Sequence, residues 1–238
     1  MIDNINIENI LFLDIETVPS EPTFDNLPDR MKKLWEHKTL QRRKENETAD
    51  EFYRSAGIFA EFGKIICISA GYFKRTGDGQ TFRITSFAGD DEILILKDFF
   101  NLLNHHYNKK DNFLCAHNGK EFDYPFIARR ALINGIKIPS ILDIAGKKPW
   151  ESNLLDTMEL WKFGDYKSYT SLNLLAAIFN IDTPKDDIDG SMVYSVYYKE
   201  KDLERIVKYC QKDVLTVAQV FLKFRGEKLL DDDNVSIV

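Results

Sequence analysis

The stretch ILFLDIETVP, from Ile10 to Pro19, constrains the fold of this chain more than any other part of it. A short apolar run beside a proline predicts a buried β-strand. Asp14 and Glu16 lie at its carboxyl end, and because strand side chains alternate between faces, both carboxylates are predicted to share one face. Two such anions repel each other unless a positive group neutralises them, and a divalent metal ion with oxygen ligands fits that role. A strand that runs into a solvated acidic turn would give the same pattern.

The composition indicates one domain with a substantial core. Of the 238 residues, 44% are hydrophobic and 13% are aromatic, which suits a single α/β domain with insertions. The formal net charge is −6, whereas proteins that bind nucleic acid through their overall charge are basic. A nucleic acid partner would therefore need a local groove or bound metal ions.

The cysteines and the hydropathy predict a soluble cytoplasmic protein. Cys67, Cys115 and Cys210 are far apart, odd in number and without zinc-site spacing, so we expect them to be reduced core residues. The sequence shows no signal peptide and no apolar stretch long enough to cross a bilayer. We therefore expect no membrane partner.

Hydrophobic periodicity predicts a mixed sheet with helices on both faces. We expect strands at 64–73 and 80–87, joined by the turn at 77–79, and another at 112–117. Helices are expected after 89–91 and over about 124–132, 172–181, 192–198 and 202–224, and 154–161 fits a strand or a helix. Residues 1–230 would form one α/β domain, and 231–238 a disordered tail.

An insertion at about residues 20–62 separates the first strand from the second. Its apolar spacing predicts two short helices with a polar hinge. It contains the densest basic cluster of the chain, which comprises Lys32, Lys33, His37, Lys38, Arg42, Arg43 and Lys44. This cluster is either a solvated helix face or a substrate clamp. Because the insertion leaves directly from the carboxyl end of the first strand, we expect it to lie beside Asp14 and Glu16.

Two further stretches carry carboxylates that could meet the first pair. Asp123 follows the predicted strand at 112–117 and begins a helix, where it could also serve only as an N-cap. Tyr209 and Asp213 lie one turn apart in the last helix and therefore share a face. They could equally be ordinary helix surface and an ion-pair partner.

Together these stretches resemble the three motifs of the DEDD superfamily of 3'-5' exonucleases, in its tyrosine-bearing branch. FLDIET resembles motif I, and YCQKD resembles motif III. HNGKEFDYPF resembles motif II in the form found in proofreading domains of family B DNA polymerases. The segment LLDTMELWKFGDYKSYTSLNLLAAIF is similar to the link between motifs II and III. The resemblance implies a stand-alone relative of such a proofreading domain, with a ribonuclease H-like fold.

The resemblance also implies the catalytic residues, which would be Asp14, Glu16, Asp123, Tyr209 and Asp213. The four carboxylates would hold two Mg2+ or Mn2+ ions, which prefer such hard oxygen ligands. Two ions of this kind can activate water and stabilise the leaving 3'-oxygen. Tyr209 would orient the attacking water.

Four other positions resemble residues that bind the single strand in this family. Thr17 matches a position that meets the terminal 3'-OH, while Asn118 and Phe122 match positions that touch the terminal nucleotides, Phe122 by stacking. Lys185 resembles a lysine that approaches the scissile phosphate, although a solvated lysine is the ordinary reading.

The sequence therefore predicts a metal-dependent 3'-5' exonuclease that acts on single-stranded 3' ends and releases nucleoside 5'-monophosphates. The polymerase relatives favour DNA over RNA and suggest a role in DNA repair. One alternative is an inactive nucleic-acid-binding module of the same fold, which a missing carboxylate would have favoured. A second is a ribonuclease H-type endonuclease, against which the pairing of Tyr209 with Asp213 argues. Mononucleotide products would indicate the exonuclease, and internal cuts the endonuclease.

Overall fold

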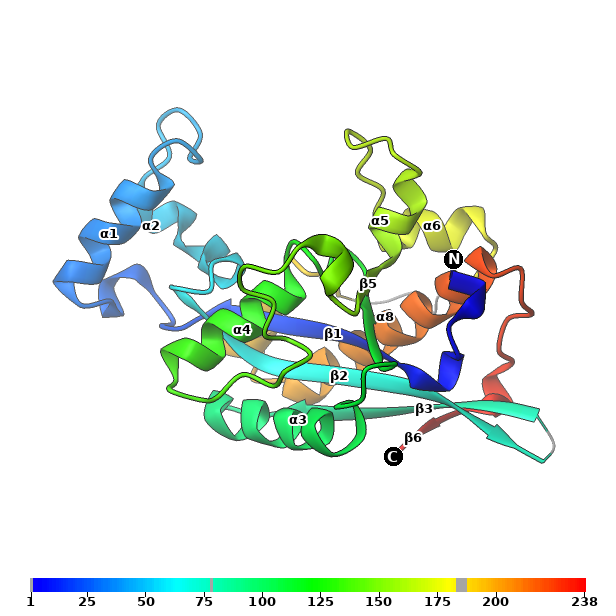
Figure 1. Ribbon diagram of the computed structural model, residues 1–238. Helices are drawn as coiled ribbons and strands as arrows, with labels where there is room; N and C mark the ends of the chain where they lie inside the picture. The colour runs from blue at the N-terminus through cyan, green and yellow to red at the C-terminus, as the bar shows by residue number, and fades with distance from the viewer. Residues whose placement is uncertain (1, 78, 183–187) are drawn as a thin grey trace.

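A mixed β-sheet forms the centre of the molecule (Figure 1). The computed structural model describes residues 2–77, 79–182 and 188–238. The strands among these residues are β1 (Ile10–Pro19), β2 (Gly63–Thr76), β3 (Gly79–Ala88), β4 (Phe113–Ala116), β5 (Leu154–Asp156) and β6 (Val235–Ile237). They lie in the order β5-β4-β1-β2-β3-β6. β1 pairs antiparallel with β2 and parallel with β4, so the strand that carries Asp14 and Glu16 is interior.

The helices cover the two faces of the sheet. Their bounds are α1 (Asp29–Thr39), α2 (Ala49–Phe52), α3 (Glu92–His106), α4 (Asp123–Ile133), α5 (Thr157–Lys162), α6 (Leu172–Ile178), α7 (Val193–Ser195) and α8 (Leu203–Phe224). Leu11 and Leu13 of β1 pack with α3 and α4, whereas Ile10 and Phe12 pack with α8. This alternation follows from the two-residue period of a strand. The predicted α/β fold with helices on both faces is confirmed.

Helix α8 is the main support of the face that carries Asp14. Asp202 caps its first turn by accepting a hydrogen bond from the Arg205 amide at 3.1 Å. Its apolar side meets the sheet, where the ring of Phe12 lies edge-on to Phe221 at 5.5 Å. Aromatic contacts of this kind fix the helix against the strand, so residues on the neighbouring turns of α8 are held above β1.

The insertion forms a small helical unit with a hydrophobic core of its own. As predicted, it contains two short helices, α1 and α2, which a 3-10 segment (Tyr53–Ile58) follows. Trp35 is 0% exposed, and its indole N–H donates to the carbonyl of Ala49 at 2.8 Å. The rings of Tyr53, Phe59 and Phe62 surround Trp35 with centroids within 5.4 Å of its own. Figure 1 shows this unit, in blue, extending away from the sheet.

A buried ion pair ties the end of the insertion to both helices of one face. Arg130 of α4 pairs with Glu92 of α3, with 2.6 Å between Nη2 and Oε2. Arg130 also donates to the carbonyl of Ala60 at 2.9 Å, and Glu92 accepts from the amide of Ile65 at 2.7 Å. Buried charges are stable only when they are paired and fully hydrogen-bonded. This network therefore fixes the point at which the insertion rejoins the sheet.

Two local predictions differ from the structure. The expected disordered tail instead contains β6, which pairs parallel with β3 from Val235 to Ile237. The free edge of β3 supplies the backbone groups that this pairing uses. The ambiguous segment 154–161 divides at Asp156, because β5 ends there and α5 begins at the next residue.

Candidate active site

Asp14 and Glu16 lie together on the α8 face of the sheet. The Sγ of Cys210, on α8, donates to Oδ2 of Asp14 at 3.4 Å and to the Asp14 carbonyl at the same distance. One ligand atom each from Asp14, Glu16 and Cys210 lies within 4.8 Å of the other two. The strand therefore brings both carboxylates to one point under α8, as the two-residue period predicted.

Asp123 is the first residue of α4 and is 3% exposed. The N-cap position belongs to Phe122, so the purely structural capping role is absent from this helix. Within the described part of the chain, the Oδ1 atom of Asp123 has no hydrogen-bond partner. Burial, followed by the charges of Asp156 and Asp213, raises the pKa of this carboxyl to about 7. A buried acid of this kind is poised to accept a cation.

Tyr209 and Asp213 complete the cluster from α8. The Tyr209 hydroxyl lies close enough to the Asp213 carboxylate for that carboxylate to raise the pKa of the phenol. Burial raises the pKa of Tyr209 far above its usual value, and the charges of Asp213, Glu16 and Asp14 add to this effect. The phenol therefore stays protonated and remains a hydrogen-bond donor.

The four carboxylates act on one another electrostatically. Burial raises the pKa of Asp14 well above its usual value, and the charges of Asp123, Glu16 and Asp213 raise it further. Burial also raises the pKa of Glu16, with Asp213, Cys67 and Asp123 as the further causes. The structure thus brings together Asp14, Glu16, Asp123, Tyr209 and Asp213, which come from three separate elements.

Sequence reasoning did not identify Asp156, which organises the loop before Asp123. Its carboxylate accepts hydrogen bonds from the amides of Asn118 and Lys120, at 2.9 and 3.0 Å. It also caps α5 by accepting from the amides of Met158 and Glu159. The D-x-x-E pattern at a helix start could have indicated the cap, but no pattern indicated the bonds to the distant loop.

Sequence reasoning also did not identify a pair of cysteines beside the carboxylates, because it assigned all three cysteines to the core. Cys67 and Cys210 are buried free thiols, and each affects the pKa of the other. Burial raises the pKa of Cys210, so its thiol stays protonated and donates to Asp14. This contact fixes the orientation of the Asp14 carboxylate.

A cavity of about 530 Å³ opens beside Glu16. Glu16 and Thr17 of β1 line one side of it, and Phe122 lines another. Arg54 and Ile58 of the insertion form a further wall. The expectation that the insertion lies beside the carboxylates is therefore confirmed.

Close backbone contact holds the insertion against β1. The Thr17 hydroxyl donates to the carbonyl of Gly57 at 2.8 Å. A Cβ atom at Gly57 would lie 3.1 Å from the carbonyl oxygen of Thr17 and 3.2 Å from Val18 atoms, so a larger residue here would press on the backbone of β1. Tyr198 adds a hydrogen bond from its hydroxyl to the carbonyl of Pro19 at 2.6 Å.

The four residues that were predicted to bind the single-stranded nucleic acid lie in different surroundings. Thr17 and Phe122 line the cavity. Asn118 has a positive φ of 60°, and its amide is held by Asp156. Lys185 lies outside the described residues.

The basic cluster of the insertion is partly engaged within the insertion itself. Arg43 donates to the carbonyls of Glu47 and Glu36 at 3.3 Å. The guanidinium of Arg42 lies 5.0 Å from the centre of the Phe59 ring. Arg43 is therefore a structural residue, whereas Arg42 covers the outside of the small core.

The site fits divalent metal ions. Its donors are hard carboxylate oxygens, which Mg2+ and Mn2+ prefer. The unpartnered buried Oδ1 of Asp123 and the raised pKa values of Asp14 and Glu16 indicate a cluster whose charge needs a counter-ion. These four carboxylates are the residues that could hold such ions.

The mixed sheet flanked by helices, with carboxylates from β1, α4 and α8, defines an α/β protein with a ribonuclease H-like fold. The sequence from residue 58 to residue 233 matches the model of a family described as a predicted 3'-5' exonuclease related to the exonuclease domain of PolB. The match spans well over half of the chain, and the chain belongs to this family. It includes Asp123, Tyr209 and Asp213 but not β1.

The family assignment implies a nuclease with a nucleic acid substrate. A search of the curated proteins finds no match to the chain. In the part of the chain that the structure describes, no helix combines the length and apolarity needed to cross a membrane.

Proposed function

We propose that this chain is a metal-dependent 3'-5' exonuclease that shortens single-stranded nucleic acid and releases nucleoside 5'-monophosphates. One observation carries the proposal. Asp14, Glu16, Asp123 and Asp213 converge with Tyr209 beside a cavity, in a member of a predicted exonuclease family. An inactive module would have no need to keep repelling carboxylates buried together.

The four carboxylates would hold two Mg2+ or Mn2+ ions. When bound, such ions lower the pKa of water and stabilise the leaving oxygen of a phosphodiester. The chain itself supplies the alignment. Cys210 fixes the Asp14 carboxylate through its 3.4 Å hydrogen bond, and Asp156 holds the loop from which Asp123 projects.

Tyr209 would orient the attacking water through its hydroxyl. Its raised pKa keeps that group protonated, so it can donate or accept a hydrogen bond but does not act as a base. We expect Tyr209→Phe to slow the single-turnover rate by about 100-fold. Metal affinity, measured by calorimetry, should stay unchanged, because no carboxylate is lost.

Tyr197→Phe provides the control for that variant. Tyr197 is a buried tyrosine near α8, but its hydroxyl donates to Asp90 at 2.6 Å, away from the cluster. It should retain the wild-type rate. An unchanged rate in Tyr209→Phe would assign the orientation of the water to another group.

The cavity beside Glu16 would receive the terminal nucleotide. Phe122 would stack on a base, and the polar end of β1 near Thr17 would meet the 3'-OH. DNA is the proposed substrate because the family is related to a DNA polymerase domain. A cytoplasmic location and a role in DNA repair are proposed with it, and buried free cysteines agree with a reducing compartment.

Product analysis tests the proposed function. Single-stranded DNA and RNA of one sequence, labelled at the 5' end, are incubated with Mg2+, with Mn2+ and with a chelator. A metal-dependent ladder that shortens from the 3' end, faster for DNA, is expected. Internal fragments would identify an endonuclease, and retained binding without cleavage in either metal would identify an inactive module.

Three cations of the insertion test its role as a substrate clamp. Neutralising Lys32, Lys33 and Arg42 with Gln should reduce the salt dependence of binding, because each cation that neutralises a phosphate releases about 0.7 counter-ion from a single strand. The log–log slope should fall by about 2. Arg43 stays unchanged because it holds the loop. If the slope of the triple variant equalled that of the wild-type protein, the basic cluster would be a solvated helix face.

A further inference from the structure

A second projection rises from the sheet between α5 and α6, at residues 162–169. Figure 1 shows it, in yellow-green, extending from the same side of the molecule as the insertion. Phe163 is 89% exposed and Tyr166 is 87% exposed, and Tyr169 is also exposed. We call Phe163, Tyr166 and Tyr169 the aromatic projection. Large aromatic side chains gathered at the surface indicate a binding surface.

The backbone of the projection is preformed. The Asp165 amide donates to the carbonyl of Lys162 at 2.7 Å, and the Lys167 amide donates to Oδ1 of Asp165 at 3.2 Å. Phe163 has a φ of 43°, in the left-handed region that bulky residues seldom adopt. Strained backbone of this kind marks functional sites, and here it directs an apolar ring into solvent.

The projection is connected to the loop that carries Asp123. The Tyr169 hydroxyl donates to the carboxylate of Glu121, two residues before Asp123. On the other side of the projection, Asp156 caps α5 and holds the same loop by accepting from the backbone amide of Asn118. Tyr169 and the base of the projection are therefore tied to the loop that leads to Asp123.

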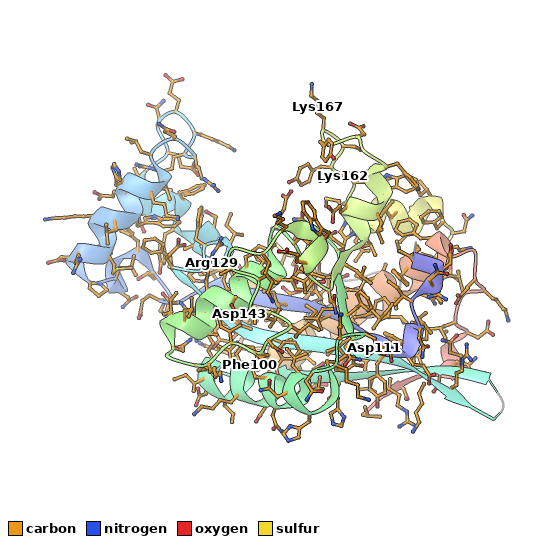
Figure 2. All side chains as sticks on the ribbon, in the orientation of Figure 1. Phe100, Asp111, Arg129, Asp143, Lys162 and Lys167 are labelled. Atoms are coloured by element: carbon orange, nitrogen blue, oxygen red, sulfur yellow. The ribbon has the colours of Figure 1, made fainter. Side chains whose placement is uncertain are left out.

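Two lysines accompany the rings. The Nζ atom of Lys162 lies 4.8 Å from the centre of the Tyr169 ring, and Figure 2 places Lys167 toward the tip of the projection. Among the described residues, neither lysine forms an ion pair. Glu159, at the base of the projection, is occupied by Lys120. Both ammonium groups are thus available to phosphates.

We propose that the aromatic projection binds the single strand upstream of the 3' end, by stacking bases on Phe163 and Tyr166 while Lys162 and Lys167 contact phosphates. Exposed rings with adjacent free cations are the combination that binds single-stranded nucleic acid without sequence preference. The proposal rests on the proposed function, because the Tyr169–Glu121 hydrogen bond joins this surface to the loop that leads to Asp123, where the end of a bound strand would be hydrolysed.

The test combines Phe163→Ala and Tyr166→Ala. Binding of a fluorescein-labelled single-stranded oligonucleotide is measured by anisotropy in an Asp14→Asn background, so that the strand is not degraded. We expect about 10- to 100-fold weaker binding than in the Asp14→Asn protein with both rings intact. Hydrolysis of the p-nitrophenyl ester of thymidine 5'-monophosphate, which has no upstream strand, should keep its wild-type rate when Asp14 is present.

Trp150→Ala is the matched control. Trp150 is 77% exposed, and the Nζ atom of Lys148 lies 5.3 Å from its ring. It precedes β5, so Trp150 lies toward the end of that strand opposite to Asp156. The control should bind the oligonucleotide as tightly as the protein with all rings intact.

Two results would overturn the proposal. The first is unchanged oligonucleotide binding in the double variant, or an equal loss in Trp150→Ala. The second concerns sedimentation: the wild-type protein would be a dimer, and the double variant would be a monomer that still binds the oligonucleotide. That result would assign the rings to contact with a second copy of the chain. Failure of the proposed function looks different, because neither the ester nor the oligonucleotide would then be hydrolysed by the wild-type protein.

Discussion

Asp14→Asn is expected to abolish hydrolysis while raising the melting temperature of the metal-free protein. Asparagine keeps the shape of the side chain but removes its charge. The loss of one metal ligand should reduce the rate by about 1,000-fold or more, since each metal ion contributes several kcal/mol of charge stabilisation. Stability should rise because the charged form of Asp14 is opposed by burial and by three neighbouring carboxylates.

The same repulsion predicts how the stability of the metal-free protein changes with pH. An acid whose pKa is raised on folding binds a proton more tightly in the folded state, so its charged form destabilises the fold. The metal-free wild-type protein should therefore lose stability as the pH rises through about 7, the pKa of Asp123. Mn2+ should restore the melting temperature of the wild-type protein and have a smaller effect on Asp14→Asn.

Calorimetric scans with chelator and with Mn2+, together with the product ladder, measure both expectations. Asp98→Asn is the control, because Asp98 is an exposed carboxylate on α3 and should change neither quantity. Full activity of Asp14→Asn would remove this residue from the metal site. A lower melting temperature without metal would show that the carboxylate stabilises the fold instead.

Asp156→Ala is expected to be the most destabilising change near the site. The carboxylate accepts four backbone amides, two from the loop before Asp123 and two at the start of α5. Removing it leaves these donors without partners, at a cost of about 3 kcal/mol. For a chain of this size that corresponds to a melting temperature about 6 to 12 °C lower. Displacement of Asp123 should also slow hydrolysis by about 100-fold.

Asp91→Ala separates capping from loop organisation. Asp91 caps α3 by accepting from the amides of Ile93 and Leu94. Its loss should cost about 1 kcal/mol and leave the rate unchanged. Urea denaturation and single-turnover rates of the two variants make the comparison. If both variants lost stability equally and kept their rates, Asp156 would be an ordinary helix cap.

Local patterns predicted the strands and helices because their signals lie within a few residues. The apolar run of β1 and the stripe of α8 follow from side-chain period, and the hairpin of β2 with β3 follows from the glycine-containing turn between two apolar runs. The C-terminal strand was missed because Val235–Ile237 is short, and only the free edge of β3 makes it a strand. That information is tertiary and is absent from a local pattern.

The same division applies to the candidate site. The motif residues could be selected from sequence because together they resemble the three exonuclease motifs, and each lies at the end or on the face of a predictable element. The roles of Asp156 and Cys210 were not predicted, because each depends on a partner far away in the sequence. That partner is Asn118 for Asp156 and Asp14 for Cys210. The roles of Thr17 and Gly57 likewise depend on how the insertion returns to β1.

The placement of β1 and α8 has a consequence for the order of biosynthesis. Asp14 and Glu16 are translated first, but the cluster lacks Tyr209 and Asp213 until α8 has been made and packed on the sheet. A nascent chain that already displays β1 and α4 therefore has an incomplete set of ligands. If the chain is a nuclease, we expect its partly synthesised forms to be harmless to the messenger RNA and ribosome that produce them.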